Sequence, residues 1–349
     1  MAGPASRLSL TASSPALAWV GHKASLEEYR AFLSEVRGPD LPPLSEDRVA
    51  PLLRRLDPMP VCDFVVRSPT GAALPGRYID AFLIVDDQWR MATAVGRVHA
   101  ACAAAARTGA RLVTLGGFSS IVGESARLDP TREFGVAFTT GNTLTAAVVA
   151  EQTLTAAEGD THRRVTVFGA GGDVGSGVCR ILHSRGIKPV LVGRRPAPLA
   201  ALAAELPGTA VCSWEDAAPR SDIVVLVASA TLGAVCLERV PQSAVVLDAG
   251  HPANGASVPG VRYARAGRVQ LACPIETDLP AVLRHYEPGE LHACLAEGMT
   301  LALENRWEAY SVGRGGITPA RAAEILALAM RHGIRPAPLR TISADPVEA

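Results

Sequence analysis

The stretch that decides the fold is Val165-Thr-Val-Phe-Gly169-Ala-Gly171-Gly172-Asp-Val-Gly175, which is followed by a helical pattern. An apolar run, a glycine cluster and a helix in this order predict the start of a Rossmann-type unit. Gly169 permits a tight turn, Gly171 and Gly172 let the backbone approach a pyrophosphate, and Gly175 allows close helix packing. The spacing is GxxGxxG, and also GxGxxxG, but not the GxGxxG of the standard NAD fingerprint.

Further apolar runs rich in β-branched residues follow this motif at residues 189–192, 223–227 and 245–247. One helical segment is predicted before the run at 189–192 (175–185), and another after it (about 197–205). Such runs are typical of strands that are buried on both faces of a parallel sheet. The alternation predicts an α/β fold with a doubly wound parallel sheet. A glycine-rich turn without any cofactor is the alternative interpretation of the motif.

The end of the second apolar run indicates which dinucleotide is bound. Arg194 and Arg195 stand where an NAD site usually has an acidic residue for the ribose 2′-hydroxyl. Guanidinium groups match a 2′-phosphate through bidentate hydrogen bonds, so the sequence predicts NADPH. Alternatively, the two arginines only solvate the strand end. The cofactor-binding candidates are Gly169, Gly171, Gly172, Asp173, Val174, Arg194, Arg195, Ala228, Ser229, Asn142 and Thr143.

Composition excludes several other classes of protein. The chain has 349 residues, 48% of them hydrophobic and 19% charged, with a formal net charge of zero. A net charge of zero does not indicate the excess of basic residues that binding to nucleic acid or anionic lipid requires. The 7 cysteines are scattered and form no CxxC pair, which indicates neither a metal site nor a disulfide framework and suits the reducing cytoplasm. No apolar stretch is long enough for a membrane span.

The order of the patterns predicts two domains. We expect a disordered N-terminus (1–16), an α/β substrate domain (17–158), an NADPH-binding domain (159–286), C-terminal helices that pack back on the substrate domain (287–340), and a tail (341–349). Within the C-terminal part, helices are predicted from Glu290 to Tyr310 and from Thr318 to His332. The proline-rich stretch 39–51 is predicted to be a loop.

Short segments with a fixed order and spacing run over nearly the whole chain. They are Gly21-His22 with Ser25-Leu-Glu27, Gly76-Arg-Tyr-Ile79, Leu115-Gly-Gly-Phe-Ser-Ser-Ile121, Thr139-Thr-Gly-Asn-Thr143, Gly172-Asp-Val-Gly-Ser176 with Val178-Cys-Arg180, Ala293-Cys-Leu-Ala-Glu297, Gly313-Arg314, Ile317-Thr318 and His332-Gly333. Together they resemble the long-chain acyl-(acyl-carrier-protein) reductases of cyanobacteria. The resemblance implies NADPH-dependent reduction of an acyl thioester, of a carrier protein or of CoA, to an aldehyde.

The resemblance also implies that Cys294, in the Ala-Cys-x-Ala-Glu segment, is the catalytic thiol. Its thiolate would attack the thioester carbonyl and form an acyl-enzyme, which hydride transfer then reduces. A predicted position near a helix N-terminus favours the thiolate. His292 is expected to point elsewhere, because residues i and i+2 do not share a helix face. The alternative for Cys294 is a buried small hydrophobic residue.

Other polar residues are candidates for the same site. Glu297 lies one turn beyond Cys294 and would orient the thiol or a proton donor; alternatively, it is a charge on a solvated helix face. Ser119, Ser120, Asn142 and Thr143 lie on glycine-containing turns that can present hydrogen-bond donors to the nicotinamide edge or the acyl carbonyl, with the two serines assigned to substrate. Helix capping alone is the alternative, especially for Asn142 and Thr143.

The chain departs from the family pattern near this expected site. Leu144 replaces a family histidine, residues 266–271 lack an acidic residue and a second histidine, and residues 311–316 lack the family's aromatic-rich segment. A smaller acyl group or another hydride transfer therefore stays open.

Two other functions are compatible with parts of the sequence. A dehydrogenase of the shikimate or amino-acid type needs a lysine–aspartate pair in the first domain, where Lys23 is the only lysine; Lys188 is the other in the chain. The second is a cofactor-binding scaffold without turnover, which the lost histidines support.

Overall fold

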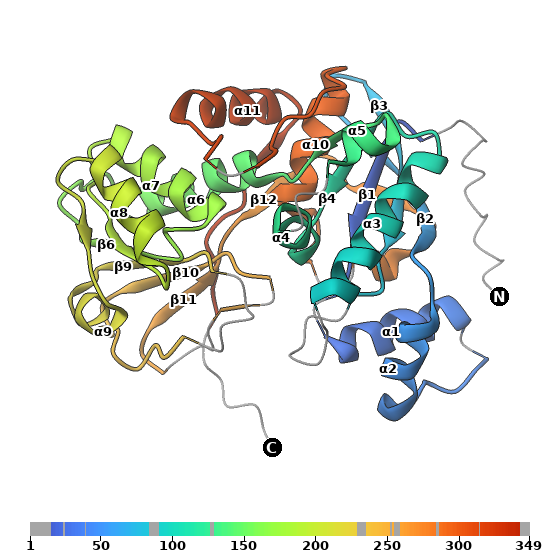
Figure 1. The fold of residues 1–349 in the computed structure, drawn as a ribbon, viewed down its shortest axis with the longest axis horizontal. Coiled ribbons are helices and arrows are strands. Elements are labelled where there is room, and N and C mark those ends of the chain that lie inside the picture. Colours follow the sequence, from blue (N-terminus) through green and yellow to red (C-terminus); the bar gives the residue numbers. More distant parts are fainter. Residues whose placement is uncertain are drawn as a thin grey trace. The chain divides into compact units, whose positions relative to one another are not determined.

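The computed structural model describes residues 15–23, 25–38, 40–83, 91–125, 129–228, 235–251, 253–254, 259–283, 286–313 and 315–342. The chain forms two compact units (Figure 1). Unit 1 comprises Met1–Thr139, Leu271–Gly289 and Gly298–Tyr310, and unit 2 comprises Thr140–Gln270, Glu290–Glu297 and Ser311–Ala349. The chain thus passes between units five times, after Thr139, Gln270, Gly289, Glu297 and Tyr310.

Unit 2 contains a sheet with the strand order β16-β11-β10-β9-β6-β7-β8. Its strands are β6 (Val165–Phe168), β7 (Val190–Val192), β8 (Ala210–Val211), β9 (Ile223–Leu226), β10 (Val245–Asp248), β11 (Arg262–Arg265) and β16 (Thr341–Ile342). All pairings are parallel except that of β16 with β11. Counted from β6, the parallel strands follow the order 3-2-1-4-5-6 of the Rossmann fold, which confirms the predicted fold class.

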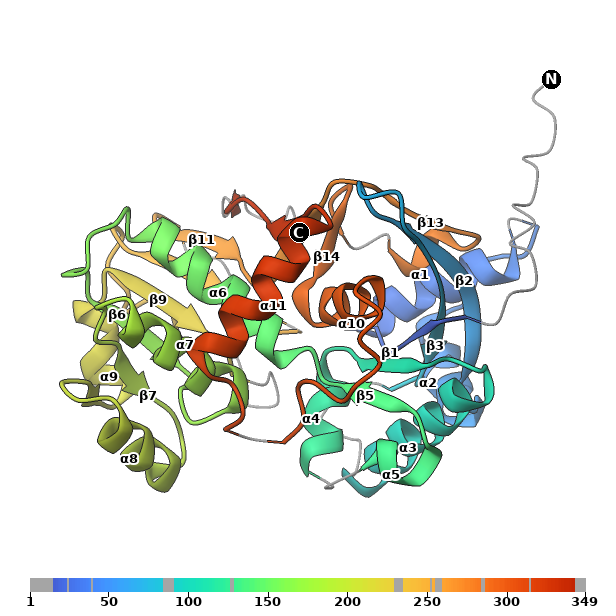
Figure 2. The ribbon, with the colours of Figure 1, turned by 90° about the horizontal axis from the view of Figure 1, so that it is seen from above.

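Helices cover both faces of this sheet. On one face lie α6 (Asn142–Ala156), α7 (Asp173–Ser184) and α8 (Pro196–Glu205), and α11 (Pro319–Arg331) packs on α6 and α7 (Figure 2). Their core includes Val149, Val178 and Ala322. The other face is covered by α9 (Trp214–Ala217), η1 (Ala218–Arg220) and the segment of Leu237 and Val240. Because both faces are covered, the central strands β6, β7 and β9 are almost entirely apolar.

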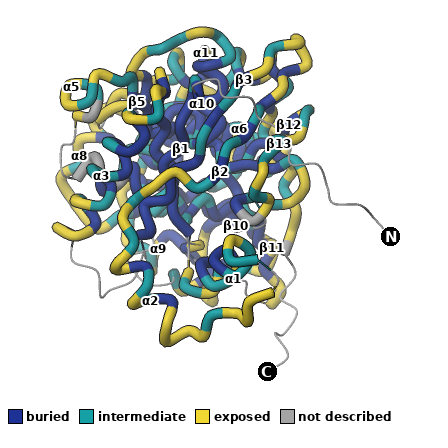
Figure 3. The backbone as a smooth tube through the Cα atoms, turned by 90° about the vertical axis from the view of Figure 1, so that its right-hand side faces the viewer, coloured by how far each residue is buried: buried dark blue, intermediate teal, exposed yellow. Residues whose placement is uncertain are grey.

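Unit 1 contains a second sheet with the order β13-β2-β3-β1-β4-β5. Its elements are β1 (Leu17–Gly21), α1 (Leu26–Arg37), α2 (Glu46–Arg55), β2 (Met59–Arg67), β3 (Ala73–Asp80), α3 (Met91–Arg107), β4 (Leu112–Leu115), α4 (Phe118–Ser125), α5 (Pro130–Phe134), β5 (Ala137–Thr139), β13 (Ile275–Thr277) and η3 (Pro280–Val282). Strand β1 is wholly buried (Figure 3). The alanines of α3 pack closely on it, as small side chains allow.

The predicted helix from Glu290 to Tyr310 is wrong at both ends. Residues Glu290–His292 form strand β14, which pairs with β12 (Arg268–Leu271) in a small sheet that also contains β15 (Ile334–Pro336). Helix α10 covers only Ala293–Leu303. The ladder to β12 satisfies backbone groups of residues 290–292, a non-local contact that overrides the local helical pattern.

The units also differ from the expected domain boundaries. Helix α6 belongs to unit 2, and so does α11, whereas residues 298–310 belong to unit 1. In the expected loop at 39–51, helix α2 begins at Glu46, because Val49 and Leu53 at i, i+4 spacing bury one helix face. Residues 1–14 and 343–349, which include most of the expected disordered terminus and tail, lie outside the described residues. Within the described residues, no helix is both long and apolar enough to span a membrane.

Candidate active site

The dinucleotide turn joins β6 to α7 in unit 2. Gly169 adopts a φ of +97°, and its N–H donates to the Val192 carbonyl at 2.9 Å. A Cβ on Gly175 would lie 2.2 Å from the Gly169 carbonyl oxygen, so only glycine lets the helix pack on the turn. The N-cap of α7 is Gly172, and no side chain caps this helix. Its N-terminus is therefore suited to bind an anionic pyrophosphate.

The neighbouring strand ends carry the other cofactor candidates. Arg194 and Arg195 are exposed and follow β7 after Gly193, and Arg195 is the N-cap residue of α8. Ala228 follows β9, and its backbone nitrogen would lie 2.8 Å from a Cβ on Gly169. These residues lie at the carboxyl edge of the sheet, where open α/β folds bind their ligands. Ser229 lies outside the described residues.

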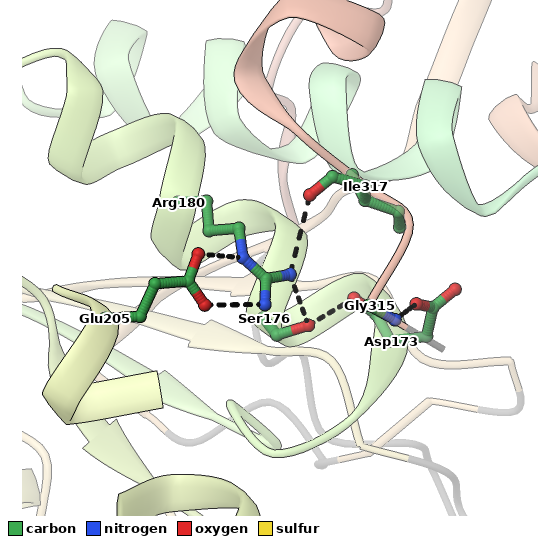
Figure 4. Close-up of polar contacts among 6 residues, drawn as sticks. All are labelled: Asp173, Ser176, Arg180, Glu205, Gly315 and Ile317. Carbon is green, nitrogen blue, oxygen red and sulfur yellow. Dashed lines mark hydrogen bonds and ion pairs between the residues drawn. The ribbon is translucent and has the colours of Figure 1, made fainter. Parts of the chain in front are cut away.

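Asp173, the first residue of α7, is held by two other segments of unit 2. Its Oδ2 accepts a hydrogen bond from Asn142 Nδ2 at 2.9 Å, and its Oδ1 accepts one from the Gly315 N–H at 3.2 Å. Figure 4 shows the second of these contacts beside the bidentate ion pair of Arg180 with Glu205. The guanidinium of Arg180 also donates to the Ile317 carbonyl at 3.5 Å. The segment 315–317 is thereby fixed against the start of α7.

Cys294 is half-buried and is the second residue of α10. It lies against Gly141, the N-cap residue of α6, whose φ is +73°. A Cβ on Gly141 would lie 2.2 Å from the Cys294 carbonyl oxygen and 2.3 Å from its Cα. The N-termini of two helices, each of which carries a partial positive charge, thus meet at the backbone of this cysteine.

Glu297 is fully buried rather than on a solvated helix face, which overturns that alternative. Its Oε2 accepts a hydrogen bond from the Leu144 N–H at 2.8 Å and so joins α10 to the first turn of α6. In the same turn, the Thr143 N–H donates to Ser311 Oγ at 3.1 Å, and the two hydroxyls lie 2.6 Å apart. The alternative in which Asn142 and Thr143 only cap the helix is wrong: Gly141 is the cap residue, and both side chains bond to other segments.

These contacts bring the cysteine and the dinucleotide turn together. Cys294 contacts Gly141, the adjacent Asn142 bonds to Asp173, and Asp173 directly follows the glycine cluster. All of these residues belong to unit 2. The sequence did not indicate the roles of Gly141 and Ser311. The signal that could have pointed to Gly141 is a glycine directly before a predicted helix, a position that often requires a positive φ.

Ser119 and Ser120 lie in unit 1, in the first turn of α4. Ser120 Oγ donates to the Gly117 carbonyl at 2.8 Å. Ser119 Oγ is buried and has no hydrogen-bond partner among the described residues. The turn is anchored by the Phe118 N–H, which donates to His22 Nε2 at 3.0 Å.

A lysine–aspartate pair that the sequence pattern did not indicate is also in unit 1. Lys23 lies two residues after β1, and Asp80 is the last residue of β3, the strand that pairs with β1 in parallel. The exposed fractions of Lys23 and Asp80 are 3% and 0%. The carboxylate accepts hydrogen bonds from the Tyr29 hydroxyl (2.9 Å), the Tyr78 hydroxyl (3.1 Å) and the Phe82 N–H (2.6 Å). Lys23 Nζ lies 5.2 Å from the centre of the Tyr78 ring. Burial lowers the pKa of Lys23.

The sheet order and the glycine turn place the chain in the class of Rossmann-type dinucleotide-binding proteins. No protein-family model matches the sequence. It is 33% identical over 337 residues to the long-chain acyl-[acyl-carrier-protein] reductase of Synechococcus elongatus, covering 91% of this chain and 97% of that protein. The chain therefore belongs to the long-chain acyl-[acyl-carrier-protein] reductase family of oxidoreductases, which confirms the resemblance found in the sequence.

Solved structures give more distant similarities. Shikimate 5-dehydrogenase of Thermus thermophilus in complex with shikimate is 16% identical with a TM-score of 0.37, covering 90% of this chain and 98% of that one. A transhydrogenase of Sinorhizobium meliloti is 14% identical with a TM-score of 0.30, covering 46% of this chain and 62% of that one.

Proposed function

We propose that this protein reduces an acyl thioester, of a carrier protein or of CoA, to an aldehyde with NADPH through an acyl-enzyme on Cys294. The observation that supports this most directly is the meeting of the α6 and α10 N-termini at Cys294, joined through Asn142 to the dinucleotide turn. Membership of the acyl-[acyl-carrier-protein] reductase family supports the substrate class.

The residues of unit 2 fit a dinucleotide with a 2′-phosphate. The glycine turn and the N-terminus of α7 would hold the pyrophosphate, and the exposed Arg194 and Arg195 would hold the 2′-phosphate. When bound, NADPH supplies the hydride that reduces the acyl carbon. Asp173 keeps Asn142 and the segment at Gly315 beside this turn.

Cys294 carries the covalent chemistry in this proposal. Its thiolate attacks the thioester carbonyl carbon, a new C–S bond forms, and the carrier thiol leaves. After the acyl carbon is reduced, the bond to Cys294 breaks and the aldehyde is released. The two helix N-termini lower the free energy of the thiolate in both steps.

Glu297 is a positioning residue in this proposal. Its carboxylate is bound to the Leu144 N–H, so it holds the first turns of α6 and α10 at a fixed distance. Ser119 and Ser120 of unit 1 stay predictions as substrate residues, and Ser120 already donates to the Gly117 carbonyl.

The test is the substitution Cys294→Ala, with Cys236→Ala, an exposed cysteine of the same unit, as the matched control. We expect Cys294→Ala to abolish aldehyde formation and the acyl adduct seen by intact-protein mass spectrometry, while NADPH binding measured by fluorescence is retained. Cys236→Ala should behave as the wild type. Full aldehyde formation by Cys294→Ala would refute the covalent mechanism.

A dehydrogenase of the shikimate type is not favoured as a second function. Its lysine–aspartate pair would have to reach the substrate, but Lys23 and Asp80 are enclosed and Asp80 already accepts three hydrogen bonds.

A further inference from the structure

Two histidines of unit 2 contact each other near the catalytic segment. His251 follows β10, and His292 is the last residue of β14, two positions before Cys294. Their ring centroids are 4.7 Å apart with an interplanar angle of 65°, an edge-to-face contact. Both histidines are half-buried residues. Imidazoles change charge near neutral pH, which suits them for acid–base work.

The loop that carries His251 is fixed by the buried carboxylate of Asp248. Its Oδ1 accepts from the Gly250 N–H at 2.8 Å, and its Oδ2 accepts from the Asn254 N–H at 2.7 Å and the Tyr263 hydroxyl at 2.6 Å. Asp248 is fully buried. The position of His251 is therefore determined by its connection to the sheet.

The segment of His292 and Cys294 is joined to that loop through Gly267. The Ala293 N–H donates to the Gly267 carbonyl at 3.0 Å. Gly267 has a φ of +70°, and a Cβ there would lie 3.2 Å from the Cβ of Ala249. Ala249 is two residues before His251, and Ala293 lies between His292 and Cys294. One close backbone approach thus brings the two histidines to the start of α10.

The strand assignment removes the reason for excluding His292. The sequence pattern predicts one helix for His292 and Cys294, in which i and i+2 side chains diverge. In the structure the strand ends at His292 and the helix begins at Ala293, so that helical rule does not apply.

Two arginines of the described residues lie on segments next to the pair, and each has a carboxylate partner. Arg268 lies directly opposite His292 in the antiparallel ladder, and its Nη1 is 3.3 Å from Glu290 Oε2. Near the loop of His251, Arg265 Nη1 is 3.5 Å from Asp248 Oδ2. Each arginine thus lies within ion-pair distance of a carboxylate.

We infer that His251 and His292 form an acid–base pair that serves Cys294, an inference that rests on the proposed function. An imidazole takes the proton of the Cys294 thiol, and the resulting thiolate attacks the thioester carbonyl. When the substrate C–S bond breaks, the carrier sulfur leaves with that proton. After reduction of the acyl carbon, the bond to Cys294 breaks and the thiolate takes up one proton, which solvent supplies through the pair. The net reaction consumes the one proton that an NADPH-dependent thioester reduction requires.

The test uses His292→Phe and His251→Phe, which keep a ring contact but remove the titrating group, with the exposed His162→Phe as the control. Acyl-enzyme formation is followed in a single turnover from about pH 5.5 to 9 by intact mass. We expect the wild type and His162→Phe to show one ionisation near neutral pH. In His292→Phe this ionisation should be lost and the rate should fall by roughly 10²- to 10⁴-fold, with unchanged NADPH affinity. His251→Phe should shift the ionisation.

A second readout does not depend on the substrate. The rate of Cys294 alkylation by iodoacetamide reports the thiolate, and its pH profile should move in His292→Phe but not in His162→Phe. Unchanged rates and pH profiles in His292→Phe and His251→Phe, with normal adduct formation, would refute the acid–base role of the two histidines and leave the proposed function intact. Absence of any adduct on wild-type Cys294 would overturn the proposed function and the inference together.

Discussion

At the scale of single residues, His22 shows how backbone contacts and burial set the charge of a side chain. Its Nε2 accepts a hydrogen bond from the Phe118 N–H at 3.0 Å, so its Nδ1, 2.9 Å from the Lys23 carbonyl, must carry the proton. The ring is therefore neutral in the folded protein. Burial lowers the pKa of His22 from 6.5 to about 4.

This shift predicts a loss of stability in weak acid. The unfolded chain protonates His22 below pH 6.5, whereas the folded chain does so only near pH 4, so stability is complete above pH 6.5 and falls as the pH drops to about 4. Between about pH 7 and pH 5 the loss from this residue should be about 2 kcal/mol. Urea unfolding of the wild type and of His22→Gln at both pH values measures it. An equal pH dependence in the two proteins would contradict this assignment.

Arg194 and Arg195 carry the prediction of cofactor preference. Both are exposed after β7, so replacing either by alanine should leave the fold intact. Because each guanidinium would bond to the 2′-phosphate, we expect Arg194→Ala and Arg195→Ala to raise the Kd of NADPH roughly tenfold without changing that of NADH. The exposed Arg220→Ala is the control. Equal weakening of both dinucleotides would show that the arginines do not read the 2′-phosphate.

At the scale of elements, local patterns predicted several strands and helices correctly, whereas elements that depend on non-local contacts were missed. Strand β6 covers the apolar run Val165–Phe168, and the helix predicted from Thr318 to His332 is α11, in which the Thr318 side chain accepts a hydrogen bond from the Arg321 N–H. Strand β14 was missed because it depends on pairing with β12, which is distant in the sequence. The Lys23–Asp80 pair was missed because adjacency of β1 and β3 cannot be read from one strand.

The candidate site follows the same rule. The glycine turn and the position of Cys294 near a helix start could be predicted from neighbouring residues. The bond of Glu297 to Leu144 joins residues 153 positions apart, so local periodicity carries no information about it. The contact of Gly141 with Cys294 likewise needed the structure.

The junction of α6 and α10 predicts that Gly141→Ala disrupts the site. The new Cβ would lie 2.2 Å from the Cys294 carbonyl oxygen, and the alanine would also have to adopt a positive φ. Gly135→Ala is the matched control, since its φ is +68° but nothing lies within 4 Å of its Cβ. Gly135→Ala should cost about 1–2 kcal/mol of stability and keep activity. Gly141→Ala should lower aldehyde formation at least about 100-fold. Equal effects in both variants would exclude the contact as the cause.

At the scale of the whole molecule, the two units are interleaved along the chain. In the sequence, helix α6 of unit 2 precedes the strands of its sheet, and helix α11 of unit 2 follows two segments that belong to unit 1. Both helices contribute to the core over one face of the sheet, with Ala146, Val149 and Ala322 among the buried residues. Neither unit therefore corresponds to one continuous segment of chain.

This interleaving predicts that residues 159–286, the nucleotide domain expected from the sequence, do not fold alone. The fragment lacks α6 and α11 and would leave Val165, Val178 and their neighbours uncovered. We expect it to be aggregated or to lack a cooperative urea transition by circular dichroism, whereas the full chain shows one. A cooperative transition in the fragment would show that α6 and α11 are dispensable for this core.

The enclosure of Lys23 has a chemical consequence for an enzyme whose product is an aldehyde. Aldehydes condense with unprotonated amines to imines, so each reactive lysine would be a site of damage by the product. The chain has two lysines, and Lys23 is 3% exposed, which leaves Lys188 as the lysine open to such attack. The surface cations are otherwise arginines, which stay protonated and do not form such imines. Under the proposed function, this composition protects the protein from chemical modification by its own product.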